Sequence, residues 1–263
     1  MNKDKWCAQK YSKGSFIQSH LNDLILPKIE NILPGNHILD VGCGQGEYTC
    51  KLANKFSNCS FTAIDSSKNM IEYAKTHNLH PNISYLQADV HSELKLGPFD
   101  NILSFWCLHW TDIKLATQQL YRVLKKEGEI FALFYSSYEG SLPNAITSLY
   151  SLDEYPNIQA FAKRAIEKRQ AVKIFIETRL KQLPFSDYSF SRQRLQIKLP
   201  SLDILKAFFK AAPYMRQIDE NTSEIMLEHM LKYFLHESES QFGGEYIYYT
   251  TPYILNIRKL NSD

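Results

Sequence analysis

The feature that most constrains this chain is a glycine-rich turn between an apolar run and a helical pattern. The apolar run contains Ile38, Leu39 and Val41, and the turn that follows contains Gly42, Gly44 and Gly46. This order is typical of a buried parallel strand, a tight turn and the N-terminus of a helix. Because a glycine has no side chain, such a turn lets a ligand lie directly against the backbone.

Two details separate this turn from the dinucleotide-binding fingerprint. The glycines follow a G-x-G-x-G spacing rather than G-x-G-x-x-G, and Asp40 stands two residues before Gly42. A carboxylate at that position would repel a pyrophosphate but would attract a ligand that carries an ammonium group. The turn therefore predicts a site for a small ligand with a positive charge.

Three further segments agree with this interpretation. A helix is predicted over residues 46–56, and the strand over residues 61–64 ends in Asp65. Asp65 lies about 20 residues after the last glycine, where an acid suits a ribose diol. A third strand, over residues 83–86, leads to a further acid, Asp89. A fourth, over residues 99–104, leads into the aromatic segment 105–110.

With these segments in order, the chain resembles the class I S-adenosylmethionine (SAM) methyltransferases. The resemblance implies an α/β fold, namely a doubly wound, seven-stranded Rossmann-like sheet with a helical cap inserted after the fifth strand. It implies SAM as the cofactor, with Met70 against the adenine and Asp89 near the adenine amino group. The cofactor-binding residues that it implies are Tyr11, Gln18, Asp40, Gly42, Gly44, Gly46, Asp65, Ser66, Met70, Ala88, Asp89, Val90, Ser104 and Phe105.

We expect four regions along the chain. Residues 1–34 form a helical segment over the site, with an apolar stripe that Pro27 should kink or divide. Residues 35–135 form the SAM-binding core, because strands and helices alternate there. That alternation ends after Tyr135, so residues 136–186 are expected to form the helical cap. Residues 187–263 are expected to supply the closing strands and helices of the core sheet.

Within the last two regions we predict helices over residues 141–150, 158–183, 202–212 and 223–236. Single strands are predicted over residues 188–199 and 245–259.

The bulk properties exclude several classes of protein. Of the 263 residues, 44% are hydrophobic, which supports a full core, and the net charge of +2 with interspersed signs gives no electrostatic footprint for nucleic acid. No apolar run is long enough to cross a bilayer, and the polar N-terminus lacks the apolar region of a secretion signal. The five cysteines form no C-x-x-C pair and no metal-ligand spacing with histidine. We therefore expect a cytoplasmic, metal-free monomer.

The N-terminal segment indicates a branch of the family. Residues 6–18 are similar to the W-x-A-x-x-Y-x-x-x-S-x-x-Q opening of the branch that contains trans-aconitate, malonyl-carrier-protein and juvenile-hormone-acid methyltransferases. All three methylate a carboxylate, so the resemblance implies a small or carrier-bound acid as the substrate. The basic stretch 163–181 is either a solvated helix face or a docking face for an acidic carrier protein.

The chemistry of the acceptor points in the same direction. A carboxylate is already ionised at neutral pH and needs no general base, whereas a phenol or an amine must lose a proton or arrive neutral. We find no Asp-His or Lys-Asp constellation that would remove a proton. Two alternatives stay open: methyl transfer to an amine, a phenol or a carbon, and a SAM-binding interaction protein without catalysis.

His109 and Trp110 are the candidate catalytic residues, because they follow the fourth strand, where this fold faces the transferred methyl group. His109 either contacts the substrate or is a buried, hydrogen-bonded residue that shapes the loop. Trp110 is predicted to be a wall of the pocket, and Cys107 a packing residue. Tyr11 and Gln18 lie seven residues apart and share a face if their segment is helical; they either anchor it to the core or close over SAM.

Overall fold

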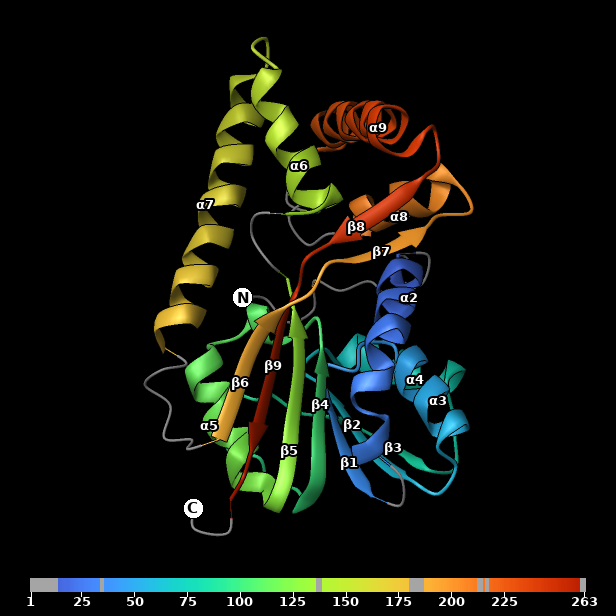
Figure 1. Ribbon diagram of the computed structural model, residues 1–263, viewed down its shortest axis with the longest axis vertical. Coiled ribbons are helices and arrows are strands. Elements are labelled where there is room, and N and C mark those ends of the chain that lie inside the picture. Colours follow the sequence, from blue (N-terminus) through green and yellow to red (C-terminus); the bar gives the residue numbers. More distant parts are fainter. Residues whose placement is uncertain are drawn as a thin grey trace.

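The computed structural model describes residues 14–33, 36–135, 139–179, 187–211, 215 and 218–260. These residues form a seven-stranded sheet with helices on both faces, and a second layer lies above the carboxyl ends of its parallel strands (Figure 1). The expected doubly wound α/β fold is therefore confirmed. Within the described residues, no helix has both the length and the hydrophobicity that crossing a membrane requires.

The sheet has the strand order β3-β2-β1-β4-β5-β9-β6. The first five strands run parallel, whereas β9 pairs antiparallel with both β5 and β6. The strands are β1 (His37–Val41), β2 (Ser60–Asp65), β3 (Ile83–Gln87), β4 (Phe99–Phe105), β5 (Leu124–Phe134), β6 (Asp187–Arg192) and β9 (Tyr253–Arg258). The strand order reverses direction at β1, which β2 and β4 flank on either side. Open α/β sheets bind ligands at such a point, at the carboxyl ends of the strands.

Alternate residues of the strands feed two separate cores. One core packs Ile38 and Phe61 against α2 (Ser15–Ile25), α3 (Glu47–Lys55) and α4 (Lys68–His77). The other packs Leu39 and Val41 against α5 (Ile113–Val123) and the loop before β4. Both faces of β1 are thus buried, which accounts for its nearly continuous apolar run.

The N-terminal helical segment is divided at Pro27, as predicted. α2 ends at Ile25, and two 3-10 turns follow, η2 (Leu26–Lys28) and η3 (Glu30–Ile32). Proline lacks a backbone N–H and cannot continue the helical hydrogen-bond ladder. Helix α2 buries Ile17 and Leu21 against the sheet and also contacts the upper layer.

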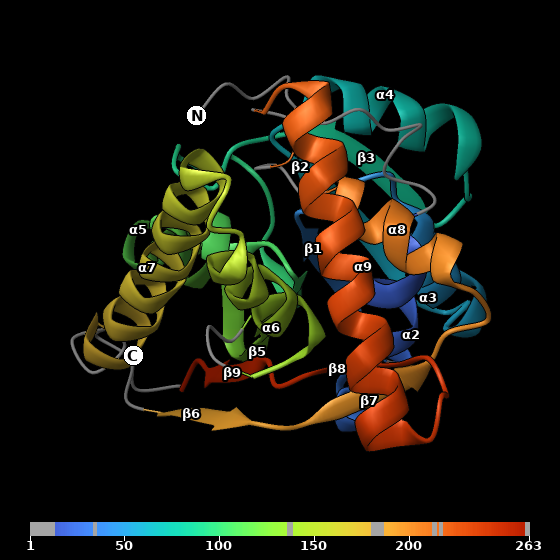
Figure 2. The same ribbon diagram turned by 90° about the horizontal axis from the view of Figure 1, so that it is seen from above.

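The upper layer lies above the carboxyl ends of the parallel strands (Figure 1). It contains α6 (Ser141–Ser148), η5 (Leu149–Ser151), α8 (Leu202–Ala211), α9 (Glu220–Phe242) and a two-stranded sheet of β7 (Leu195–Lys198) and β8 (Ile247–Thr250). Helix α7 (Pro156–Arg179) runs from α6 down the side of the molecule where α5 lies (Figure 2). Residues 136–186 therefore supply only part of the layer above the sheet.

Two strand predictions need correction, because each expected strand is two strands in different sheets. Residues 188–199 divide into β6 and β7, and residues 245–259 divide into β8 and β9. Pro252 lies in the second break, and its missing N–H removes a donor that a continuous strand would need. As a result, each segment passes from the core sheet to the upper layer, which joins the two parts of the molecule.

Candidate functional site

The glycine turn lies directly after β1, at the point where the sheet changes direction. All three glycines have positive φ angles, of 76° at Gly42, 55° at Gly44 and 77° at Gly46. A methyl group added at Gly42 would lie 2.3 Å from Cys107 Sγ, and one at Gly46 would lie 2.5 Å from the ring of Tyr85. Gly42 and Gly46 therefore pack against protein side chains.

Gly44 differs from the other two glycines, because among the described residues no atom beyond its chain neighbours lies within 4 Å of where its side chain would begin. This position is the open part of the turn, so a ligand can approach the backbone there without a clash. That the cofactor lies across Gly44 stays a prediction, and the space at this glycine leaves room for it.

Asp65, at the end of β2, holds the turn in place. One carboxyl oxygen accepts a hydrogen bond from the Gly44 N–H (3.1 Å), and the other accepts one from the Ser67 N–H (2.8 Å). Burial raises the pKa of the Asp65 carboxyl, although the two backbone hydrogen bonds oppose the shift. Each oxygen keeps a free lone pair with which it could accept from a ribose hydroxyl.

Asp40 lies below the turn and is almost completely buried, with 4% of its surface exposed. It accepts a hydrogen bond of 2.5 Å from the Thr49 hydroxyl. Burial raises the pKa of Asp40 to about 6; the bond from Thr49 lowers it, and the negative charge of Asp65 raises it further. A cationic ligand beside Asp40 would offset the negative charge of Asp65 and favour the ionised form of Asp40.

Asp89 follows β3 and is fixed by a histidine. One of its oxygens accepts from the backbone N–H of His91 (3.1 Å) and from His91 Nδ1 (2.8 Å). The Nε2 atom of His91 accepts from the Asp112 N–H (2.9 Å), so the ring proton of a neutral His91 lies on Nδ1 and points at Asp89.

The other predicted residues of this region follow β2 and β3 or lie on α4, close to these acids in the chain. Ser66 is half-buried and directly follows Asp65, while Met70 is 2% exposed at the start of α4. Ala88 donates its N–H to Asp65 O (3.1 Å), and Val90 is 6% exposed. Their contacts with an adenine remain a prediction.

At the end of β4, two predicted cofactor residues pack into the protein. The Ser104 hydroxyl is fully buried and donates to Val41 O (3.1 Å), which ties β4 to β1. Phe105 is 9% exposed and meets the Tyr48 ring edge-on, with 5.2 Å between the ring centroids. Both side chains shape the floor of the turn.

The candidate catalytic residues form an aromatic cluster with the end of β5. His109 and Trp110 lie in the 3-10 turn η4 (Leu108–Trp110), with their ring centroids 4.8 Å apart. His109 also meets the Tyr135 ring edge-on at 5.1 Å, and Tyr135 lies 4.7 Å from the Trp106 ring. Cys107 packs on Gly42, and burial raises the pKa of its thiol, which agrees with the predicted packing role.

The remaining predicted residues are placed less directly. Gln18 is half-buried on α2, whereas Tyr11 lies outside the described residues. Two arginines lie near the point where the chain leaves the core sheet: Arg192 is the last residue of β6, and Arg194 lies between β6 and β7. Arg192 forms an ion pair with Glu139 (3.1 Å), and Arg194 lies 4.3 Å from the ring centroid of Tyr249.

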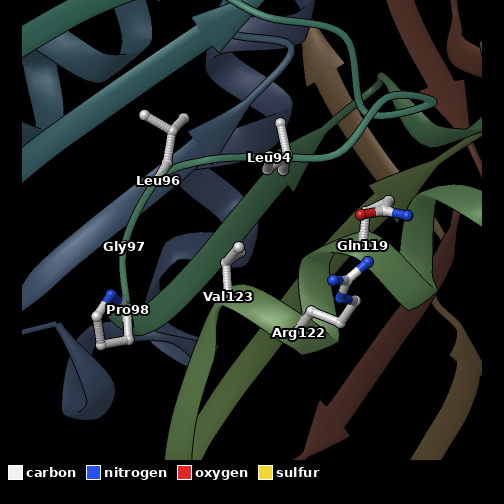
Figure 3. Close-up of a pocket in the computed structure, with 7 residues that line it drawn as sticks. All are labelled: Leu94, Leu96, Gly97, Pro98, Gln119, Arg122 and Val123. Carbon is white, nitrogen blue, oxygen red and sulfur yellow. The ribbon is translucent and has the colours of Figure 1, made fainter.

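A separate hollow of about 280 Å³ lies at the opposite end of β4 (Figure 3). Its lining comes from the loop before β4 and from the end of α5: Leu94, Leu96, Gly97, Pro98, Gln119, Arg122 and Val123. Parallel strands bind ligands at their carboxyl ends, and this hollow lies at the amino end. It is therefore distinct from the cofactor turn.

Several residues of the site were missed by the sequence analysis. Thr49 binds Asp40, Tyr85 covers Gly46, and His91 orients Asp89. Asn22 is a fourth, since it accepts a hydrogen bond from the Trp106 indole (2.7 Å). The only signals in the sequence were a threonine one helical turn into α3 and a histidine two residues after Asp89.

Comparison with known proteins places this fold in a family. Residues 38–128 match the family described as a methyltransferase domain. Protein 235L of Invertebrate iridescent virus 6, which is named as a methyltransferase, is 27% identical over 57% of this chain and 56% of its own length. The malonyl-[acyl-carrier protein] O-methyltransferase of Acetivibrio thermocellus is 29% identical over 65% of this chain and 62% of its own length. The chain thus spans less than two thirds of these relatives.

A solved structure shares the fold. Phosphoethanolamine N-methyltransferase 2 of Haemonchus contortus, in complex with phosphomonomethylethanolamine and S-adenosylhomocysteine, superposes with a TM-score of 0.55 at 17% identity. The superposition covers 92% of this chain and 53% of that one. Residues 38–128 thus match a methyltransferase domain, and the strand order and the shared fold agree with this match: the fold is that of the class I methyltransferases, the class of enzyme that uses SAM as its cofactor.

Proposed function

We propose that the protein transfers the methyl group of SAM to the carboxylate of a small or carrier-bound acid. The observation that carries the proposal is the open backbone at Gly44, with Asp65 bound to the Gly44 N–H and Asp40 buried nearby. An open turn admits the nucleoside, and acids beside it favour a cofactor with ammonium and sulfonium charges.

The cofactor supplies a methyl group that a sulfonium already activates, so the protein chiefly has to align the reactants. Asp65 accepts from the ribose hydroxyls while its own position is fixed by two backbone amides. Asp40 balances the positive charge of the amino acid part. His109, Trp110 and Tyr135 form the aromatic wall on the acceptor side, which excludes water and orders the acid.

The carboxylate acceptor has separate support. Relatives of this chain include a malonyl-[acyl-carrier protein] O-methyltransferase, and the chain's N-terminal motif is similar to that of the carboxyl-methylating branch. A carboxylate also suits a site without a dedicated base, because its pKa near 4 leaves it ionised at neutral pH.

The proposal is tested in two steps. Calorimetric titration with SAM and S-adenosylhomocysteine measures cofactor binding, and a protein that binds neither is not a methyltransferase. Incubation with methyl-labelled SAM and a panel of acids (trans-aconitate, malonyl-carrier protein and fatty acids) then identifies the acceptor. Treatment with base releases label from a methyl ester but not from an N-methyl or C-methyl product, so base-stable label contradicts the carboxylate assignment.

Cofactor binding is expected to weaken as the pH falls through about 6, the pKa of Asp40. Below that pH the carboxyl is neutral and no longer attracts a cation, so affinity should fall by up to about tenfold per pH unit. The free energy of unfolding should depend on pH in the opposite direction. Because the pKa of Asp40 is raised in the folded state, that state holds the proton more tightly than the unfolded chain does. Ionisation of Asp40 therefore lowers the stability of the fold as the pH rises towards 6.

Titration calorimetry of SAM between pH 5 and 8 measures this dependence, with Asp40→Asn as the control. The variant should bind SAM more weakly at pH 8 and lose most of the pH dependence. A wild-type affinity that is constant down to pH 5 would contradict the role of Asp40.

Changes in the upper layer are expected to alter the acceptor rather than the cofactor. Asn144 of α6 donates to Glu237 of α9 (2.9 Å), and the Tyr249 hydroxyl of β8 donates to the same oxygen (3.0 Å). Glu237 is 3% exposed, so Asn144→Leu removes a partner from a buried acid and shifts the three elements. We expect the acceptor KM to rise about tenfold while the SAM dissociation constant changes less than twofold. The reverse pattern in steady-state kinetics and calorimetry would show that this layer does not set acceptor choice.

A further inference from the structure

Trp106 has a backbone conformation that a bulky residue rarely adopts. It directly follows β4, and its φ angle is 56°, in the left-handed region that favours glycine. Residues in this region persist where surrounding contacts hold them, and they cluster at functional sites. The contacts of Trp106 therefore indicate what this conformation does.

Two hydrogen bonds hold Trp106. Its backbone N–H donates to Leu133 O (2.6 Å), and its indole Nε1 donates to Asn22 Oδ1 (2.7 Å). Asn22 is only 3% exposed, on the apolar face of α2, and Trp106 is 6% exposed. Asparagine is seldom buried without a specific partner, so the indole explains why this polar side chain lies in the core.

The turn at Trp106 directs the four residues that follow it. Cys107 lands on Gly42, with its Sγ 2.3 Å from where a methyl group on that glycine would lie. The His109 ring then lies tilted against Trp110 and edge-on to Tyr135, which itself contacts the Trp106 ring. Residues 107–110 thus lie between the cofactor turn, which Cys107 contacts, and Tyr135, which His109 contacts.

We propose that Trp106, held in its left-handed conformation by Asn22, is a positioning residue that fixes residues 107–110 between the cofactor turn and Tyr135. The inference rests on the proposed methyl transfer, because it assigns these residues to the alignment of acceptor and methyl group. It also links helix α2 to the reaction geometry, because the Trp106 indole donates a hydrogen bond to Asn22 on α2 and contacts the Tyr135 ring.

The test compares Asn22→Leu, Trp106→Phe and the double variant. Each single change leaves a buried polar group without its partner, whereas the double change removes both, so stability against denaturant should partly recover in the double variant. A structural role predicts that activity recovers with stability. The positioning role predicts that kcat stays at least about tenfold low in all three, with the dissociation constant of S-adenosylhomocysteine changed less than threefold.

Leu120→Ala is the matched control, because Leu120 is a residue of α5 that is fully buried in the other core. It destabilises the fold by making a cavity and should leave kcat unchanged. Asn22→Ala replaces Asn22→Leu if the larger side chain prevents folding. The proposal is overturned if kcat recovers in the double variant, or if Leu120→Ala lowers kcat equally.

Amide hydrogen exchange tests the positioning role in the same variants without a methyl acceptor. The Trp110 N–H donates to Cys107 O (2.9 Å) and the Thr111 N–H to Leu108 O (3.0 Å), so both amides report on this turn. We expect them to exchange at least about tenfold faster in all three variants, without ligand and with S-adenosylhomocysteine, but not in Leu120→Ala. If these two amides exchange at the wild-type rate in the variants, the positioning role is overturned. If the wild-type protein transfers no methyl group to any acid, the proposed function is contradicted, but the exchange result still stands.

Discussion

Replacement of Gly44 by valine is expected to abolish SAM binding and to leave the protein folded. Gly44 is the one glycine of the turn whose missing side chain faces open space, so a valine there would occupy the volume assigned to the cofactor. We expect at least a hundredfold loss of affinity, about 2.7 kcal/mol, in calorimetric titration. The left-handed φ of 55° adds a separate cost to folding, about 1–2 kcal/mol.

Gly243 offers a matched control for that backbone cost. It ends α9 with a φ of 59°, and in the described part of the chain it too has no atom beyond its neighbours within 4 Å of the missing side chain. Gly243→Val should therefore lose a similar amount of stability in denaturant titrations without any change in SAM affinity. Normal SAM binding by Gly44→Val would show that the turn is purely structural and that the cofactor lies elsewhere.

The core of the fold could be predicted because each local signal has a single structural solution. The run around Ile38 is buried on both faces, and the glycines that follow it can only form a turn. The helix predicted over residues 223–236 is shorter at both ends than α9, which runs from Glu220 to Phe242, although the sequence contains signals for both true ends. Asp219 caps the first turn through the Thr222 N–H (2.9 Å), and Gly243 ends the helix in the left-handed conformation.

The division of the two closing strands could not be predicted from their patterns. Residues 245–259 are rich in tyrosine and isoleucine throughout, so the β pattern continues across the break at residues 251–252. What separates β8 from β9 is the pairing partner: β8 pairs with β7, and β9 with β5 and β6. Pairing over such distances depends on tertiary packing, which local propensity does not encode.

The candidate site shows the same distinction. Asp40 and Asp65 could be found from their distance to the glycines, because motif spacing fixes where a strand ends. The residues that support them come from elsewhere in the chain: Tyr85 reaches Gly46 from β3, and Asn22 reaches Trp106 from α2. Such contacts follow from the packed structure and leave no periodic signal in one sequence.

Asp65→Ala is expected to lower SAM affinity by about 2–4 kcal/mol, or about 30-fold to 1000-fold, because it removes two charge-assisted hydrogen bonds to the ribose. The same change also releases the Gly44 and Ser67 amides, which by itself loosens the turn. Asp100→Ala is a suitable control for such a loss. Asp100 accepts the His37 N–H (2.8 Å) at the amino end of β1, so its removal should lower stability without affecting SAM.

A ligand without the 2′-hydroxyl separates ribose binding from support of the turn. If Asp65 binds the diol, the wild-type protein should prefer S-adenosylhomocysteine over its 2′-deoxy analogue by at least about tenfold, whereas Asp65→Ala should bind both alike. If Asp65 only supports the turn, the variant binds both ligands more weakly and keeps the wild-type preference. Competition titrations of the two ligands against both proteins distinguish these outcomes, because the preference cancels any general loss of affinity.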